Sequence, residues 1–448
     1  MIAGNGYVSR VFVPGEKDEN GNTTGSYKYA RIYVMSPVEG ITGTISGFTL
    51  KCQAPFVLPI TLDATSVLFA SVPTKQELTL SNETSIEVKS HPTWVNLVIS
   101  GRTVSLMAAN NITAASREGV VVLSNSQGDV EITVTQAASE NPVFASGDGS
   151  ASSPYMISTA KQFDNIRNYS HLCFKLDNDI DLSSLINPTS TGWEPIDFSG
   201  HFDGCNHKIT GLWINSPGRD NIGLFGTINN ATISGIRLEL SEKGITGRNN
   251  VGGIVGYPSG TSDLDTRISD CCVTGNISGE SAIGGICGSQ YVASWHRTNI
   301  SRCQYNGDIT VSRGSAGGII GSSYGTTTIS DCYAIANISA KDGWACYGMG
   351  IGGYQVSNCY FVGTINGPST TDSWRGCYGI TTNTEMYSWC THSYYNSELF
   401  KGTGSRDGIP KTEQEMKRQA TYENWDFNAI WQIEEGKGYP TLRCFNER

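Results

Sequence analysis

A glycine-rich apolar motif recurs between Gly223 and Ile365 and constrains the fold of this chain more than any other feature. Each copy holds two or more glycines around one or two large apolar residues. A second motif follows each copy: a β-branched residue, Ser, any residue and then usually Cys. The glycine-rich copies are Gly223-Leu-Phe-Gly226, Gly252-Gly-Ile-Val-Gly256, Gly284-Gly-Ile-Cys-Gly288, Gly317-Gly-Ile-Ile-Gly321 and, more loosely, Gly348-Met-Gly350.

The second motif gives the repeat its period. Its copies begin at Ile233, Ile268, Ile300, Ile329 and Val356, so they are 35, 32, 29 and 27 residues apart. A period in this range indicates stacked supersecondary units. The apolar runs are short, β-branched and broken by Gly, Asn, Asp and Ser, which indicates that each unit is built from β-strands.

One such unit is too small to bury its own apolar face, so neighbouring units must stack and share a core. We therefore predict a β-solenoid with continuous ladders of Ile, Val and Cys, and with glycines where the backbone bends or passes close to a neighbour. Four cysteines share one phase of the repeat and are predicted to be buried free thiols, because Cys packs as a small apolar residue. Disulfides and a metal site are the alternatives, although no CxxC pair favours zinc. The four are Cys271, Cys303, Cys332 and Cys359.

The glycine-rich copies resemble the GLUG motif of bacterial surface proteins, and the resemblance covers residues 145–445. Residues 61–138 are similar to the BACON domain of Bacteroidales proteins. This second resemblance implies a β-sandwich that binds glycans or mucin, or that serves as a spacer. Its matching residues are Pro92-Thr-Trp94, Val104-Ser-Leu106, Asn110-Asn-Ile-Thr113, Arg117 and Ile132-Thr-Val-Thr-Gln136. We expect Trp94 to be a core residue rather than a ligand platform.

The predicted fold class is all-β, with two small N-terminal β-sandwich-like modules followed by a capped β-solenoid. Capping boxes at Thr159 and Thr412 predict short helices near the two ends of the solenoid. The predicted segments are an N-terminal β module and possible anchor at 1–60, a BACON-like sandwich at 61–138, a linker at 139–158, a cap and lead-in coils at 159–222, the solenoid at 223–400 and a C-terminal cap at 401–448.

Composition excludes several classes of function. The net charge of −10 argues against a nucleic-acid partner, which would require a basic surface. No apolar run approaches the roughly 18–20 residues of a membrane helix, so we predict no membrane insertion. The first residues, Met1-Ile-Ala-Gly-Asn-Gly, lack the basic start and apolar core of a signal peptide.

Catalysis is not predicted. Many β-helical proteins are polysaccharide lyases or hydrolases, which need a carboxylate pair or acids with calcium on one face, and this remains an alternative. The repeats carry few acids and the six histidines are scattered. Asp177, Asp179 and Asp181 alternate and make a calcium site conceivable, but solvated acids on a strand are the preferred interpretation. No cofactor and no metal are predicted.

Aromatic residues that follow the glycine-rich copies form the candidate binding site. Aromatic faces pack against the apolar faces of sugars, and polar neighbours bind the hydroxyl groups. The alternative is that these side chains only anchor loops to the coil. The predicted ligand-binding residues are Tyr257, Tyr291, Trp295, His296, Arg297, Tyr324, Trp344, Tyr347, Trp374, Arg375 and Tyr378.

Together these patterns predict a non-enzymatic attachment or display protein that recognises carbohydrate. The resemblances imply an origin in Bacteroidales bacteria or in their phages. Because the start of the chain resembles no export signal and the thiols are predicted to stay reduced, we favour a phage virion fibre over a secreted or cell-surface adhesin. Expected partners are a glycan or host cell surface and, through the N-terminal module, other subunits of a virion or surface assembly. Oligomerisation is possible.

Overall fold

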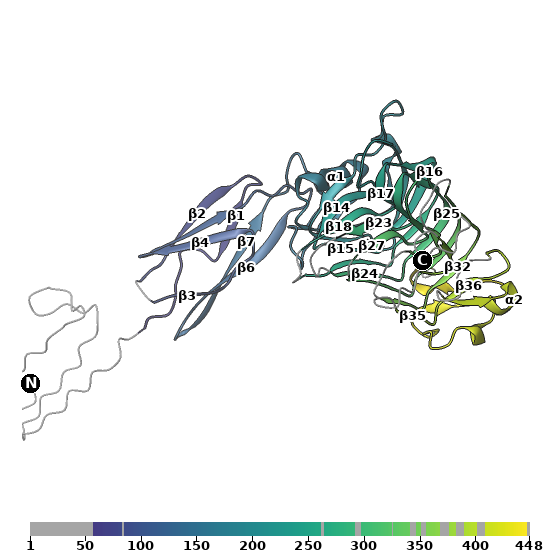
Figure 1. Ribbon diagram of the computed structural model, residues 1–448. Coiled ribbons are helices and arrows are strands. Elements are labelled where there is room, and N and C mark those ends of the chain that lie inside the picture. Colours follow the sequence, from purple (N-terminus) through teal and green to yellow (C-terminus); the bar gives the residue numbers. More distant parts are fainter. Residues whose placement is uncertain are drawn as a thin grey trace, which may run out of the picture. The chain divides into compact units, whose positions relative to one another are not determined.

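The computed structural model describes residues 57–82, 85–260, 264–291, 297–324, 326–340, 346–350, 355–367, 376–381, 389–400 and 408–445 (Figure 1). The protein is 51% strand and 6% helix, which confirms the predicted all-β class. The predicted N-terminal module at 1–60 lies almost entirely outside the described residues. Contacts divide the chain into two compact units, one formed mainly by residues before Thr135 and one that contains the solenoid.

The first unit is sandwich-like. One sheet has the order β1 (Ser66–Phe69), β7 (Gly128–Gln136), β6 (Arg117–Asn125), β3 (Glu87–Ser90), and the other β2 (Thr74–Thr79), β5 (Thr103–Ala108), β4 (Val95–Ser100). Strands β2 and β4 both pair antiparallel with β5. Alternate residues point inward, as Val104 and Leu106 in β5 show by being fully buried. Trp94 is only 7% exposed, which confirms that it is a core residue.

The second unit is a β-solenoid of about 6 turns across residues 173–395. Each complete coil passes through four parallel sheets, which we number 1 to 4 in the order in which the chain visits them. Sheet 1 contains β11 (Ile196–Phe198), β14 (Phe225–Asn229), β18 (Val255–Ser259), β23 (Cys287–Tyr291) and β27 (Ile320–Tyr324). Sheet 2 contains β8 (Tyr155–Ile157), β9 (Cys173–Leu176), β12 (His201–Asp203), β15 (Thr232–Ser234), β19 (Thr266–Ser269), β24 (Arg297–Ser301), β28 (Thr326–Ser330), β31 (Gln355–Ser357) and β35 (Trp389–Thr391).

Sheet 3 has the most strands. In each complete coil the chain passes from sheet 3 to sheet 4, and from there to the sheet 1 strand of the next coil. Sheet 3 contains β10 (Ile180–Asp181), β13 (Lys208–Asn215), β16 (Arg237–Thr246), β20 (Cys272–Thr274), β21 (Ile277–Gly279), β25 (Gln304–Val311), β29 (Tyr333–Ala340), β32 (Tyr360–Val362), β33 (Ile365–Asn366), β36 (Tyr394–Asn396) and β37 (Ile409–Lys411). Sheet 4 contains β17 (Asn249–Gly252), β22 (Ser281–Gly284), β26 (Ala316–Gly317), β30 (Cys346–Tyr347) and β34 (Cys377–Tyr378).

The register between coils follows the period found in the sequence. Ile233 pairs with Ile268, Ile268 with Ile300, Ile300 with Ile329, and Ile329 with Val356. All five of these side chains are buried in one continuous core. The uneven spacing of the motif therefore reflects connections of different length, since the paired positions stay level from coil to coil.

The variable third residue of the second motif makes the turn from sheet 2 to sheet 3. It has a positive φ in each successive coil: 66° at Gly235, 55° at Asp270, 49° at Arg302, 54° at Asp331 and 52° at Asn358. Gly, Asp and Asn tolerate this left-handed conformation best, which explains why they occupy most of these positions. Arg302 is the exception, and its guanidinium binds both carboxylate oxygens of Asp270 in the coil before, at 2.6 and 2.7 Å.

In four of the five glycine-rich copies, the glycine directly before the central apolar residue faces a core side chain of sheet 3: Gly253, Gly285, Gly318 and Gly348. A Cβ added to Gly285 would lie 2.2 Å from the Tyr305 ring, and one added to Gly348 would lie 2.7 Å from the Phe361 ring. The same Cβ at Gly253 and Gly318 would meet Val273 and Ala334 at 2.6 and 2.5 Å. These glycines are therefore required because the opposite wall of the coil packs directly against the backbone.

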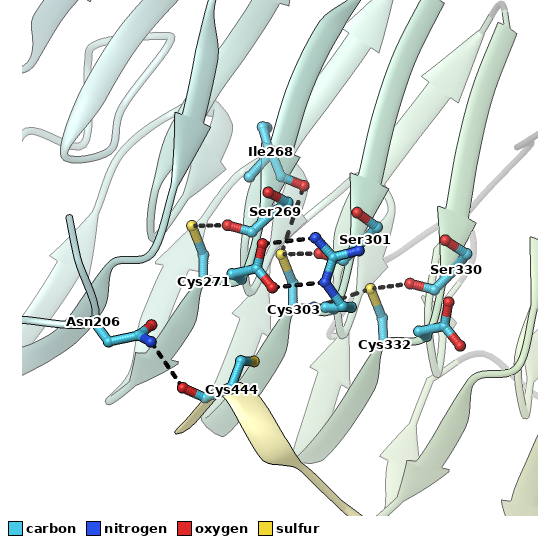
Figure 2. A network of polar contacts seen from close by, with 12 residues as sticks. Asn206, Ile268, Ser269, Cys271, Ser301, Cys303, Ser330, Cys332 and Cys444 are labelled. Carbon is cyan, nitrogen blue, oxygen red and sulfur yellow. Dashed lines mark hydrogen bonds and ion pairs between the residues drawn. The ribbon is translucent and has the colours of Figure 1, made fainter. Parts of the chain in front are cut away.

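The four cysteines of the second motif form the predicted ladder of buried free thiols. Figure 2 shows three of them, Cys271, Cys303 and Cys332. Each thiol donates to the carbonyl oxygen two residues earlier, as Cys271 does to Ser269 at 3.1 Å and Cys303 to Ser301 at 3.3 Å. Cys303 also lies 3.8 Å from the carbonyl oxygen of Ile268 in the preceding coil. Burial raises the pKa of the Cys271 and Cys332 thiols, so both remain protonated at neutral pH.

A short helical segment covers the first coils of the solenoid, and it consists of α1 (Ala160–Asn165) and η1 (Ile166–Asn168). The Thr159 side chain accepts a hydrogen bond from the Gln162 amide, as the sequence predicts, and Gln162 in turn accepts one from the Ser158 amide. The Phe163 ring contacts the rings of Phe202 and Trp193 in the core. The 3-10 turn η2 (Leu182–Ser184) follows β10.

The C-terminal segment packs a second, aromatic core against the outer face of sheet 3. It contains α2 (Glu413–Met416), η3 (Gln419–Thr421), β38 (Trp431–Gln432), β39 (Thr441–Leu442) and η4 (Arg443–Phe445). Trp431, Trp425 and Tyr422 contact the rings of Tyr333, Tyr360 and Tyr394, which lie in three successive coils. The segment also reaches the first coils, where Asn206 donates to the Cys444 carbonyl at 2.9 Å (Figure 2). The sequence suggested contact with the last coil, whereas the segment spans the solenoid lengthwise.

Candidate functional site

The predicted binding residues fall at two different corners of the coil. Among the described members, Tyr257, Tyr291, Arg297 and Tyr324 lie at the first corner, where the chain passes from sheet 1 to sheet 2. Tyr347 and Tyr378 lie in sheet 4 at the second corner, where the chain passes from sheet 3 to sheet 4. In the order of the sheets these corners are separated by the turn from sheet 2 to sheet 3, so the described residues of the set do not share one edge.

At the first corner, Tyr291 and Tyr324 are direct neighbours in the register of β23 and β27. Tyr257 lies one coil earlier in β18, where it is partly exposed, and Arg297 is exposed at the start of β24. Trp295 and His296, as well as the side chains of Tyr291 and Tyr324, lie outside the described part of the structure. The interior beneath this corner is polar, since the buried Thr327 hydroxyl bonds to Ser323 at 2.7 Å and to Gln290.

At the second corner, the Tyr347 and Tyr378 rings stack with 5.3 Å between centroids and 7° between planes. Tyr347 is 1% exposed, which suits a residue that supports Tyr378 rather than one that contacts a ligand itself. Burial raises the pKa of the Tyr347 hydroxyl, so this side chain stays neutral at physiological pH. Trp344, Trp374 and Arg375 lie outside the described residues, on the connections 341–345 and 368–375 that join sheet 3 to this ring stack.

A ladder of charged residues runs along the same second corner. Arg219 binds Glu194 through two hydrogen bonds of 2.6 and 2.7 Å, and Arg248 binds Asp220 through bonds of 2.7 and 2.6 Å. These hydrogen bonds lower the pKa of both Glu194 and Asp220, so the acids are charged at neutral pH. Arg313 lies 3.6 Å from Glu280 in the coils that follow.

The sequence analysis missed this ladder, although a signal was present. A charged residue stands four positions before the first glycine of each of the first four glycine-rich copies: Arg219, Arg248, Glu280 and Arg313. Backbone hydrogen bonds link these residues from coil to coil, from Arg248 to Arg219 at 2.7 Å and from Glu280 to Arg248 at 2.7 Å. Exposed ion pairs contribute little stability, so their main effect is to give this corner a polar, charge-balanced surface.

The acidic residues considered for calcium have local structural roles. Asp181 accepts from the Ser183 amide at 2.9 Å, Asp179 accepts from the Lys208 amide at 2.9 Å, and Asp177 accepts from the Ser158 hydroxyl at 3.1 Å. Within the described residues, no three or more His, Cys, Asp or Glu side chains come together to hold a metal ion. No helix in the described part of the chain has the length and apolarity to cross a membrane.

Comparisons with known proteins show similarity to parts of two curated proteins. No protein-family model matches it. Over 96 residues it is 44% identical to a protein of Evansella cellulosilytica named as a candidate Gly-rich membrane protein, a match that covers 20% of this chain and 11% of that protein. Over 296 residues it is 26% identical to Halomucin of Haloquadratum walsbyi, covering 60% of this chain and 3% of Halomucin. The matched regions are thus small parts of both curated relatives.

The solenoid is also found in a solved structure. The crystal structure of a candidate immunoglobulin A1 protease from Bacteroides ovatus superimposes with a TM-score of 0.52 and 22% sequence identity. The superposition covers 68% of this chain and 96% of the other. At this level of identity the similarity establishes a shared fold, and a fold of this kind carries many unrelated functions.

Proposed function

We propose that this protein is a non-enzymatic attachment or display protein at a surface outside the cytoplasm, and that it recognises carbohydrate. The observation that carries the proposal is the in-register solenoid itself. Its rigid core holds successive connections at fixed corners, and a rigid scaffold with variable loops is a common arrangement for recognition. The name of one curated relative, a Gly-rich membrane protein, supports a place at the cell surface.

The second corner is the better candidate for the carbohydrate site. Two connections in consecutive coils each contain one Trp. The first leads into the strand that holds Tyr347 and the second into the strand that holds Tyr378, and these two tyrosine rings stack. The neighbouring charge ladder offers alternating donors and acceptors without a large net charge, which suits a neutral, hydroxyl-rich ligand. The proposed ligand-contacting residues are therefore Trp344, Trp374, Arg375 and Tyr378, with Tyr347 as their support.

A glycan array with the full chain tests this function. Binding to a defined set of glycans is expected, and it should be lost when the array is probed with a Trp344→Ala, Trp374→Ala double variant. A Trp295→Ala variant, altered at the first corner, is the matched control and should bind as the wild type does. Absence of binding by the folded wild-type protein to any glycan would contradict the carbohydrate assignment.

The proposal also excludes proteolysis. Because the similar solenoid of Bacteroides ovatus is described as a candidate immunoglobulin A1 protease, immunoglobulin A1 is the substrate to test. Incubation of the full chain with this antibody should leave the heavy chain intact on a denaturing gel. Cleavage at a defined site would overturn the non-enzymatic assignment.

A phage virion fibre of a Bacteroidales phage is a second candidate, and the buried thiol ladder favours it. Reduced cysteines at four consecutive coils suit a protein that is assembled in a reducing cytoplasm. The two candidates differ in where the protein resides. Proteomics of purified virions and of washed cell envelopes would separate them, because the virion candidate predicts the protein in particles and the surface candidate predicts it in envelopes.

A further inference from the structure

Two cysteines of sheet 4 form a pair that is distinct from the thiol ladder. Cys346 in β30 and Cys377 in β34 are direct partners in the parallel register of two consecutive coils. Adjacent strands lie about 4.8 Å apart, which is within the Cα separation of about 4.4–6.8 Å found across disulfides. A Cβ added to Gly367 would lie 2.6 Å from the Cys377 sulfur and 3.6 Å from the Cys346 sulfur. Both sulfurs therefore point toward the same small volume.

The exposure of this pair differs from that of the ladder cysteines. The side chains of Cys271, Cys303, Cys332 and Cys359 are all fully buried, whereas Cys377 is 6% exposed. A small oxidant in solution can therefore reach Cys377 more readily than any thiol of the ladder.

We propose that Cys346 and Cys377 are an oxidisable pair that forms a disulfide between two consecutive coils when a small peroxide is present. The inference concerns the core of sheet 4 and does not depend on the proposed carbohydrate function. It assigns a site of covalent modification beneath the second corner, because the next residues in both strands are the stacked Tyr347 and Tyr378.

The reaction can be written with all atoms accounted for. The Cys377 thiolate attacks hydrogen peroxide, the O–O bond breaks, and the products are a sulfenic acid at Cys377 and hydroxide, which takes the proton released by the thiol to give water. The Cys346 sulfur then attacks the Cys377 sulfur, the S–O bond breaks, and a second water leaves with the Cys346 proton. Two thiols and one peroxide thus give one disulfide and two waters.

The order of attack follows from the environment of the two sulfurs. Cys377 is 6% exposed and Cys346 is 0% exposed, so a small oxidant reaches Cys377 first. The hydrogen bond with Cys346 lowers the pKa of Cys377, against the opposing effect of burial, and so favours the thiolate that attacks. Cys346 is then the resolving thiol, already adjacent in the next strand.

Peptide mapping of the peroxide-treated full chain tests the proposal. The protein is exposed to stoichiometric hydrogen peroxide, the remaining thiols are alkylated in denaturant without reductant, and the digest is analysed by mass spectrometry. We expect a linked peptide pair containing Cys346 and Cys377, lighter by two hydrogens, while the ladder cysteines are recovered alkylated. Oxidation should also raise Tm by roughly 5 °C, because the bond closes a long loop.

The control variants separate the pair from general oxidation. Cys377→Ser should abolish both the linked peptide and the shift in Tm, whereas Cys390→Ser, altered in sheet 2, should leave both unchanged. If Cys377→Ser does not fold, the peptide map of the peroxide-treated wild-type protein is sufficient to test the proposal. Recovery of Cys346 and Cys377 as alkylated thiols, or linkage of either one to another cysteine, would overturn the proposal.

Discussion

At the scale of single residues, the solenoid depends on positions where a side chain has no room. In four of the five glycine-rich copies a glycine lies against the opposite wall of its coil, and Gly285 comes closest to a side chain of that wall. An added Cβ would lie 2.2 Å both from the Tyr305 ring and from the Gly318 carbonyl oxygen in the next coil. Neither group can move without disturbing a paired strand, because Tyr305 belongs to β25 and pairs with Ala334.

Gly285→Ala should therefore lower the free energy of unfolding by about 1–3 kcal/mol or more, which is the usual cost of overpacking a core. Chemical denaturation followed by circular dichroism measures this change. Gly218→Ala is the matched control, because an added Cβ there meets nothing within 4 Å. An equal effect of both substitutions would contradict the packing role assigned to the glycine-rich motif.

At the scale of elements, the C-terminal segment has its own core on the outside of sheet 3. Trp431 is fully buried there, 4.3 Å from the Trp425 ring, and its indole nitrogen lies 3.3 Å from Asp331. This aromatic cluster is separate from the core inside the coils. We therefore expect the segment to open without unfolding the solenoid.

Trp431→Ala should reduce the stability of this segment by about 3–5 kcal/mol, the usual cost of truncating a buried aromatic side chain. Hydrogen exchange is the appropriate measurement. Amides at 412–445 should lose protection while those at 233–365 keep it. Phe427→Ala, at the partly buried edge of the cluster, should have a smaller effect, and loss of protection throughout the solenoid would show that the two cores unfold together.

The first helix of this segment contains a pH-sensitive cap. Thr412 and Glu415 form a reciprocal capping box, and the hydrogen bonds from Thr412 lower the pKa of Glu415 to about 2. A carboxyl whose pKa is lower in the folded state stabilises that state above its unfolded pKa, which is about 4.3, and this contribution is lost as the pH falls toward about 2.

Glu415→Gln should therefore destabilise the segment at pH 7 and have little effect near pH 2. Thermal unfolding of both proteins across this range would show the difference between them closing as the pH falls. Glu423→Gln, which alters an exposed acid in the same segment, serves as the control. A difference that stays constant from pH 7 to pH 2 would mean that the charge of Glu415 is not what stabilises the cap.

At the scale of the whole molecule, the repeat in the sequence predicts which positions pair in successive coils, but it does not predict at which corner of the coil extra residues are inserted. Ile233, Ile268 and Ile300 are level in the structure because their spacing follows one motif. The spacing of that motif cannot say where extra residues are inserted. The connection from β23 to β24 runs from sheet 1 to sheet 2, and the connection from β29 to β30 runs from sheet 3 to sheet 4. Trp295 belongs in sequence to the first connection and Trp344 to the second, so the two residues looked equivalent in the sequence although their connections join different sheets.

The contacts that the C-terminal segment makes with the first coils could not be predicted from the sequence either. Arg237 donates to the Phe445 carbonyl across 208 residues, and Asn206 donates to Cys444 across 238 residues. Contacts at such separation depend on the length of the whole stack, which only the folded coils define. The N-caps at Thr159 and Thr412, in contrast, were predictable, since each depends on a local pattern of four residues, although only Thr412 forms the complete capping box.

The measurement that tests this account most directly is the affinity of the full chain for the glycan bound most strongly on the array, determined by calorimetry. We predict that Trp344→Ala and Trp374→Ala each weaken binding by about 1–2 kcal/mol, or roughly 5- to 30-fold, with unfolding curves close to that of the wild type. Trp295→Ala should leave the affinity unchanged. Equal affinity of all three variants and the wild type, with all of them folded, would contradict the claim that the second corner of the solenoid carries recognition.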